Sequence, residues 1–256
     1  MIKTKIDWCD FSWNPVTGCL HGCEYCYARK QARRYYPELV EKLRDTDKGP
    51  LCLGFEKCGP VKSMAPVVAF NPMFWPARLN EPAKRKKPAR IFVVSMGDLF
   101  GKWVPDSWIE QVFKACEAAP QHTYYFLTKN RVRYRTGYLA EIWRERLQPR
   151  DKKWWWGYSE TGLQYPVDRE LSCKFNEFVS IEPLLGQIEI RENLAPNWII
   201  VGAQTNPLVL PKKEWVLDIR KQCADLKIPL FEKNSLEDLE LPGGLIQQWP
   251  DNESAK

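Results

Sequence analysis

Short runs of β-branched and aromatic residues alternate along this chain with stretches that carry apolar residues at helical spacing. This alternation is typical of βα units, in which successive strands run parallel. An initial strand is expected around residues 5–11. Further strands are expected at residues 91–95, 123–128, 154–159, 178–181 and 198–201, with a short one near Leu230.

Helical periodicity appears in three places between these strands. The clearest case follows Pro105-Asp106, where apolar residues stand at i, i+3, i+4 and i+7 as far as Cys116. Residues 138–146 and 212–226 show the same pattern, and the second places Trp215, Ile219 and Cys223 on one face. Cys116 and Cys223 are therefore predicted to be core residues rather than metal ligands.

One region departs from this scheme. Residues 45–90 contain repeated prolines and Gly-Pro pairs, so we expect an irregular insertion with one short helix. The predicted organisation is a single α/β domain over residues 1–240 that carries this insertion. Residues 241–256 are predicted to form a C-terminal tail.

Polar or charged residues follow the end of each predicted strand. They are Ser95-Met96-Gly97-Asp98, Thr128-Lys129-Asn130, Ser159-Glu160, Ser180-Ile181-Glu182, Gly202-Ala203-Gln204 and Glu232-Lys233. In a barrel of parallel strands these positions meet at the carboxyl-terminal rim, where such barrels place their chemistry. The sequence therefore predicts a partial or complete parallel (β/α) barrel with its site at that rim.

Three cysteines stand in one short segment, where Cys19, Cys23 and Cys26 have the spacing C-x3-C-x2-C. Three thiolates can bind three irons of a four-iron cluster and leave the fourth iron open to a small molecule. A structural zinc site and unligated thiols are the alternatives. Zinc sites usually close with four ligands, and Cys52 and Cys58 could complete one only as a distant pair.

Composition narrows the class of protein. The chain has 256 residues, of which 44% are hydrophobic, and a formal net charge of +6, which permits a nucleic-acid partner without establishing one. No apolar run is long enough to cross a bilayer, and the amino terminus lacks the apolar core of a secretory signal. We expect a cytoplasmic protein with reduced thiols, and the odd total of nine cysteines argues against a disulfide framework.

The cysteine spacing, with Tyr25 before the last cysteine, resembles the signature of the radical S-adenosylmethionine (radical SAM) superfamily. Longer phrases resemble an uncharacterised phage-associated family, a domain of unknown function that is similar to radical SAM proteins. These phrases are residues 11–19, 95–100, 127–130, 180–186 and 198–202. The resemblance extends from about residue 6 to residue 235.

The resemblance implies a role for each residue of the cysteine segment. Cys19, Cys23 and Cys26 would each bind one iron of a [4Fe–4S] cluster as thiolates. S-adenosylmethionine would chelate the fourth iron through its amino and carboxylate groups. Tyr25 would pack against the adenine.

The resemblance also implies cofactor contacts at two strand ends. Gly97 and Asp98 take the place of the acidic turn that receives the methionine amino group, although the usual form there is Gly-Gly-Glu. Ser159 and Glu160 stand where the superfamily commonly contacts the ribose hydroxyls. The superfamily's further glycine-rich motif is not recognisable in residues 180–186.

Three charged residues at strand ends are candidate catalytic groups. Glu182 could face either cofactor or substrate, and Lys129 and Lys233 could pair with carboxylates or phosphates. Structural salt bridges are an equal alternative for both lysines. The two histidines, His21 and His122, do not suggest a conventional histidine base.

The expected activity is reductive cleavage of S-adenosylmethionine to methionine and a 5′-deoxyadenosyl radical that acts on an unknown substrate. A nucleoside or nucleic acid is one candidate substrate. An external one-electron donor, such as a flavodoxin, is implied because no second complete cluster motif is visible. The alternative is a non-catalytic binding protein whose fold is stabilised by zinc or by a degenerate cluster.

Overall fold

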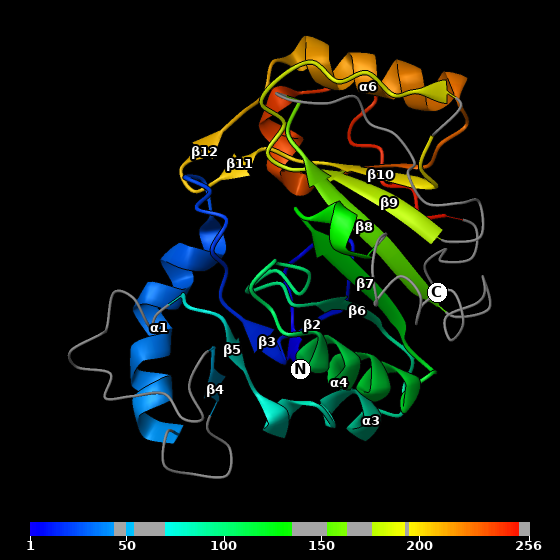
Figure 1. Ribbon diagram of the computed structural model, residues 1–256. Helices are drawn as coiled ribbons and strands as arrows, with labels where there is room; N and C mark the ends of the chain where they lie inside the picture. Colours follow the sequence, from blue (N-terminus) through cyan, green and yellow to red (C-terminus); the bar gives the residue numbers. More distant parts are fainter. Residues whose placement is uncertain (44–49, 54–69, 135–152, 163–175, 193–194, 251–256) are drawn as a thin grey trace. The chain divides into compact units, whose positions relative to one another are not determined.

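The computed structural model describes residues 1–43, 50–53, 70–134, 153–162, 176–192 and 195–250. The chain divides into two compact units, Met1–Trp154 and Trp155–Lys256, which are described in turn (Figure 1). The helix predicted at residues 138–146 lies outside the described residues. Within the described ranges, none of the helices combines the length and the apolar character that crossing a membrane requires.

The first unit is built on parallel strands with one short antiparallel strand at the edge. The strands follow the order β1 (Ile2–Lys3), β2 (Phe11–Trp13), β6 (Arg90–Val93) and β7 (Thr123–Thr128). The pairs β2–β6 and β6–β7 are parallel, and β1 pairs antiparallel with β2. The carboxyl ends of the parallel strands β2, β6 and β7 therefore lie along one edge of the sheet.

The predicted initial strand exists, but it lies at β2 (Phe11–Trp13) and not around residues 5–11. The amide of Cys9 donates to the carbonyl of Ile6 (3.3 Å), and the amide of Thr4 donates to the carbonyl of Asp10 (3.2 Å). These bonds close a turn, so pairing with β6 begins only at Phe11.

Helix α4 (Asp106–Glu117) covers one side of β6 and β7, as Figure 1 shows. Its buried face carries the apolar residues at the predicted helical spacing, and Cys116 is fully buried among them. Phe113 lies edge-on to Phe126 of β7, with ring centroids 5.6 Å apart, and also packs against Trp154. The prediction of Cys116 as a core residue is confirmed, and burial raises the pKa of its thiol.

The described part of the proline-rich region is more ordered than predicted. A small antiparallel sheet joins β3 (Val16–Thr17), β5 (Met73–Phe74) and β4 (Leu51–Cys52). Helix α1 (Tyr27–Leu43) precedes this region, and η2 (Pro76–Arg78) and the predicted short helix, α3 (Glu81–Lys84), follow β5. Cys52 is disulfide-bonded in this structure, in contrast to the expectation of reduced thiols.

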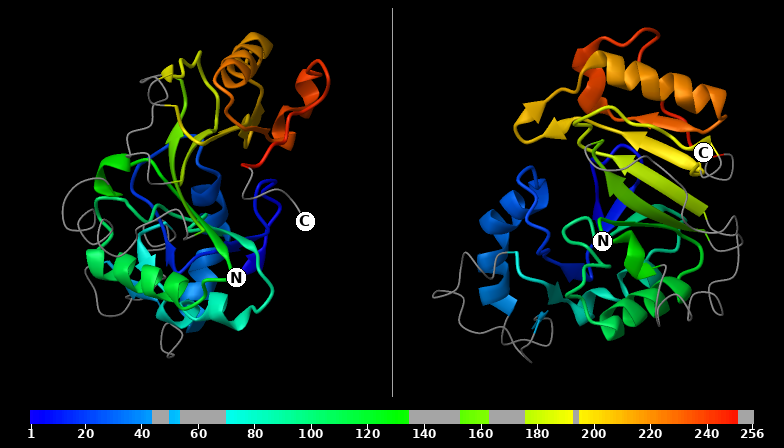
Figure 2. Two further views of the ribbon diagram at one scale, coloured as in Figure 1. Left: turned by 90° about the vertical axis from the view of Figure 1, so that its right-hand side faces the viewer. Right: turned by 45° about the horizontal axis from the view of Figure 1, so that its top comes forward.

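The second unit also contains parallel strands. Their order is β8 (Trp154–Glu160), β9 (Asn176–Ile181), β10 (Trp198–Val201) and β13 (Leu230–Glu232). Helix α6 (Lys213–Asp225) lies along β10 and β13, as the two views of Figure 2 show. Its residues Val216, Ile219 and Cys223 enter the core, whereas Trp215 is only partly buried.

Residues beyond the predicted end of the domain pack against this second unit. Gln247 pairs with Phe231, and the carbonyl of Gln248 accepts a hydrogen bond from the Trp198 indole (2.9 Å). The Trp249 ring lies edge-on to Phe231, with centroids 4.8 Å apart. The second unit therefore includes residues 241–250.

Both units confirm a mixed α/β chain with mainly parallel strands. The strand pairings found among the described residues close neither unit into a barrel. The remaining elements of the second unit are the hairpin β11 (Gln204–Thr205) and β12 (Leu208–Val209) and the short helix η5 (Asn234–Leu239).

One buried ion pair ties α6 to β13. The Glu232 carboxylate is fully buried and accepts hydrogen bonds from Arg220 at both oxygens, each at 2.7 Å. The amide of Ile246 donates to the same carboxylate at 2.8 Å. Removing the guanidinium would leave a buried charge without its counter-ion.

We expect Arg220→Ala to lower the free energy of unfolding by about 3–5 kcal/mol, measured by urea denaturation at pH 7. The matched control is Lys221→Ala on the exposed side of the same helix, which should change stability by less than about 0.5 kcal/mol. Equal losses in the two variants would show that the pair does not stabilise the unit.

Candidate functional site

The loop that carries the three cysteines joins β3 to α1 in the first unit. Its first turn is anchored by backbone contacts: the amide of Gly18 donates to the carbonyl of Met96 (2.8 Å), and the amide of Cys19 to that of Phe70 (3.0 Å). Gly18 and Gly97 also pair as an isolated parallel bridge. The loop is therefore attached to the segment that follows the carboxyl end of β6.

Only glycine fits at position 18. Its φ is +89°, and a Cβ atom there would lie 2.0 Å from the carbonyl oxygen of Asn71. A Cβ at Gly97 would lie 2.8 Å from the carbonyl oxygen of Gly18. The two glycines allow an approach of backbones that any side chain would prevent.

Cys19, Cys23 and Cys26 are free thiols and are half-buried. Cys19 and Cys26 pack against an apolar cluster whose buried members are Ala28, Ala32, Phe70, Met73 and Trp75. Backbone amides point at two of the sulfurs: that of Arg29 donates to Cys26 Sγ (3.4 Å), and that of His21 donates to Cys19. Such N–H···S contacts stabilise thiolate charge.

Burial raises the pKa of the Cys19 thiol to about 12. The amide of His21 opposes this rise, and the nearby charges of Asp98, Cys23 and Cys26 add to it. The three sulfurs are thus close enough to influence one another. A thiol in this environment becomes a thiolate ligand when a bound cation offsets its charge.

The donor set fits a cluster bound by three thiolates. It consists of three free thiols on one loop, two of which accept backbone N–H bonds and pack against apolar side chains. Each thiolate of a four-iron cluster binds a different iron, so the sulfurs need not converge on one point. Within the described residues, no group of three or more His, Cys, Asp or Glu side chains is placed to hold a single metal ion.

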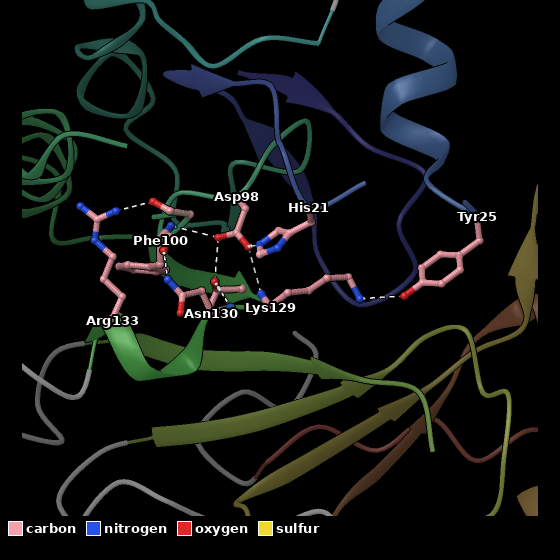
Figure 3. A network of polar contacts seen from close by, with 9 residues as sticks. His21, Tyr25, Asp98, Phe100, Lys129, Asn130 and Arg133 are labelled. Carbon is pink, nitrogen blue, oxygen red and sulfur yellow. Dashed lines mark hydrogen bonds and ion pairs between the residues drawn. The ribbon is translucent and has the colours of Figure 1, made fainter. Parts of the chain in front are cut away.

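Asp98 lies beside this loop and is 4% exposed. Its Oδ1 accepts hydrogen bonds from Thr128 Oγ1 (2.7 Å) and the amide of Phe100 (3.0 Å). Its Oδ2 accepts from His21 Nε2 (2.8 Å) and the amide of Lys129 (3.0 Å), as Figure 3 shows. A carboxylate offers about four acceptor sites, so Asp98 is fully engaged within the protein. This geometry favours a role in holding the loop over the predicted contact with the methionine amino group.

Lys129 reaches the other end of the cysteine loop. Its ammonium group donates to the hydroxyl of Tyr25 (2.9 Å) and lies 5.2 Å from the centre of that ring. It is also close enough to Cys23 for the two side chains to interact electrostatically. Lys129 therefore pairs with an aromatic hydroxyl in this structure.

Two further contacts join the loop ends of the first unit. Asn14, directly after β2, accepts a hydrogen bond at its Oδ1 from the amide of Met96 (2.8 Å), and its side chain also contacts Ser95 Oγ (3.3 Å). The hydroxyl of Tyr27 donates to the carbonyl of Ser95 (2.7 Å). The expectation that polar residues gather at the strand ends is confirmed within this unit.

The other predicted site residues belong to the second unit. Glu182 follows β9 and forms an ion pair with Lys233, which follows β13. A Cβ at Gly202 would lie 3.0 Å from the Lys233 side chain, so this glycine leaves room for the pair. Glu160, at the end of β8, is buried, and its carboxylate accepts a hydrogen bond from the amide of Thr161 (2.9 Å). Ser159, one position earlier, is half-buried.

Sequence reasoning gave no role to His21 and placed Thr128 only among the polar strand ends. His21 stands between two cysteines, and that position was the only available sign of its involvement. Its partner Asp98 lies 77 positions away in the sequence, so the pairing depends on the fold.

A family described as a protein of unknown function, DUF5131, matches residues 3–237. The chain belongs to the DUF5131 family. No curated protein and no solved structure matches this DUF5131 chain. Membership confirms the expectation of an uncharacterised family, while its phage association and its likeness to radical SAM proteins stay predictions.

We expect Gly18→Ala to release the cysteine loop of the DUF5131 protein, because the new Cβ would collide with the backbone of Asn71. In the metal-free protein, alkylation of Cys19 should become at least about tenfold faster, since local opening exposes buried thiols. Peptide mass spectrometry after timed iodoacetamide labelling measures this rate.

The matched control is Gly22→Ala in the same loop. Gly22 also has a positive φ, +78°, but a Cβ there meets nothing within 4 Å. Alkylation of Cys19 should accelerate less in Gly22→Ala than in Gly18→Ala, because Gly22→Ala adds only the strain of a positive φ, about 1–2 kcal/mol, and no collision. Equal acceleration in both variants would contradict the role of the close approach.

Proposed function

We propose that this DUF5131 protein binds a [4Fe–4S] cluster through Cys19, Cys23 and Cys26 and acts as a radical SAM enzyme. The observation that carries the proposal is the set of three free, half-buried thiols on one loop fixed behind the end of β6. The parallel strand pairs of each unit support the further proposal of a partial barrel of radical SAM type.

When bound, such a cluster supplies one electron that cleaves S-adenosylmethionine into methionine and a 5′-deoxyadenosyl radical. The protein's own contribution is to position and shield. Apolar packing at Cys19 and Cys26 partly shields two of the ligands from water. The amide of Arg29 stabilises charge on Cys26.

Tyr25 and Lys129 form the polar side of the proposed site. The phenol ring is half-buried beside Cys26, which suits the proposed contact with adenine. The Lys129 ammonium group fixes the hydroxyl of this ring. Lys129 would also place positive charge beside the cluster and any anionic part of the cofactor.

The second unit supplies the candidate substrate groups of this proposal. Glu182 and Lys233 offer opposite charges at the ends of β9 and β13, the two strands that flank β10, a combination suited to a polar substrate. Ser159 and Glu160 stay the proposed ribose contacts. A nucleoside or nucleic acid is our candidate substrate because the net charge is +6, and an external flavodoxin-like protein is the proposed electron donor.

The rival function is a non-catalytic, metal-stabilised binding protein. One observation favours it: Asp98 already accepts four hydrogen bonds, which leaves no acceptor for the methionine amino group. A zinc ion or a degenerate cluster would then serve only to hold the loop.

The deciding experiment is anaerobic reconstitution followed by metal and product analysis. We expect about four irons and four sulfides per chain, and dithionite with S-adenosylmethionine should yield 5′-deoxyadenosine. Cys23→Ala should lose both properties, whereas the control Cys116→Ala, in the core of α4, should keep the iron content. A colourless protein with one zinc ion and no product would contradict the proposal.

We expect Lys129→Met to lower the midpoint potential of the bound cluster by on the order of tens of millivolts. A nearby cation stabilises the reduced state, which carries one more negative charge. Redox titration of the reconstituted protein measures the potential, and Lys129→Arg should restore most of it. An unchanged potential in Lys129→Met would show that this charge does not act on the cluster.

A further inference from the structure

The two segments between the cysteines are each held at one residue. Between Cys19 and Cys23, Leu20 and Gly22 are exposed, and His21 alone is partly buried. Between Cys23 and Cys26, Glu24 is exposed and Tyr25 is partly buried. A backbone hydrogen bond from the amide of Cys26 to the carbonyl of Cys23 (3.3 Å) closes the second segment, and the contacts of His21 and Tyr25 orient the loop further.

We propose that Asp98 is the positioning residue that sets the arrangement of the three thiols, through His21 on one side and through Lys129 and Tyr25 on the other. The biological purpose of this positioning role rests on the cluster function proposed above. The effect of Asp98 on the order of the cysteine loop can be measured in the metal-free protein.

The first arm runs from Asp98 to Cys19. His21 Nε2 donates to Asp98 Oδ2 at 2.8 Å, and the Trp103 ring lies edge-on to the imidazole, with centroids 4.9 Å apart. These two contacts fix the orientation of the imidazole. The amide of the same residue donates to the sulfur of Cys19, so the fixed side chain also fixes that N–H···S contact.

The second arm runs from the same oxygen to Cys26. The amide of Lys129 donates to Asp98 Oδ2 at 3.0 Å, and its side chain extends to the hydroxyl of Tyr25 at 2.9 Å. Tyr25 directly precedes Cys26. Figure 3 shows the contacts of Asp98 with His21 and with Lys129, and the contact of Lys129 with Tyr25.

The two carboxylate oxygens of Asp98 have different partners. Oδ1 accepts hydrogen bonds from the hydroxyl of Thr128 in β7 and from the amide of Phe100. These two bonds hold the Asp98 side chain against the end of β7 and the turn after β6. Oδ2 serves both arms. A loop held in this way loses little conformational freedom when it binds a cluster, because its ligands are already ordered.

Asp98→Asn is the sharpest test because it keeps the shape and one acceptor oxygen. An amide nitrogen at the Oδ2 position could not accept from the amide of Lys129, and His21 Nε2 could bond to it only by changing tautomer and accepting in place of donating. In the metal-free protein we expect amide exchange across residues 19–26 to become about tenfold faster or more. Exchange in β6 and β7 should stay near the wild-type rate.

Three variants separate the arms. His21→Ala should accelerate exchange mainly in residues 19–23, and His21→Gln, whose amide can still donate to Asp98, should restore most of the protection. Lys129→Ala should act mainly near Cys26. The matched control is Asp10→Asn at the amino end of β2, because Asp10 also accepts a backbone amide and a side-chain donor, both from Arg90.

Unchanged exchange across residues 19–26 in Asp98→Asn would overturn the proposal. If Asp98→Asn loses protection in β6 and β7 as well, the comparison of His21→Ala with His21→Gln becomes the test. Equal exchange protection of residues 19–23 in these two variants would overturn the proposal. Iron uptake gives the second readout: Asp98→Asn and His21→Ala should reconstitute more slowly than His21→Gln.

The experiments can refute the positioning role and the cluster function independently of each other. Wild-type protein that takes up no iron, with the expected exchange pattern, would remove the cluster and leave the positioning role. Wild-type protein that takes up iron, with exchange unaffected by Asp98→Asn, would remove the positioning role alone.

Discussion

The arrangement of the candidate site depends on the buried carboxylate of Asp98. A charge that is 4% exposed is costly unless it is hydrogen-bonded. Here four donors come from the cysteine loop, the turn after β6 and the end of β7. Satisfying one charge therefore draws three separate segments together. The site is an outcome of this requirement as much as of hydrophobic packing.

The glycine contact complements this hydrogen-bonded centre. Gly18 and Gly97 bring the start of the cysteine loop against the chain that leaves β6, and Asp98 is the next residue after Gly97. Backbone approach thus sets where the loop begins, and the carboxylate sets how its later residues lie. In the second unit, the pair of Glu182 and Lys233 shows the same tendency of parallel strands to bring polar ends together.

The sequence predicted most strands because β-branched and aromatic runs leave few other options, and the run at residues 123–128 forms β7 as expected. It also predicted that polar strand ends meet. It failed at residues 5–11, where local turn bonds outweigh strand propensity. It also missed His21, since no local pattern indicates a partner 77 residues away. Spacing reveals a set of thiols, whereas the contacts that hold them depend on tertiary structure.

The central claim is that the three thiols hold a four-iron cluster with one open iron. Electron paramagnetic resonance of the anaerobically reconstituted, dithionite-reduced protein, with and without S-adenosylmethionine, tests it most directly. The account predicts a [4Fe–4S]⁺ signal whose g-values shift when the cofactor is added, because the cofactor binds the open iron. A spectrum without a cluster signal, or a cluster signal that the cofactor leaves unchanged, would contradict it.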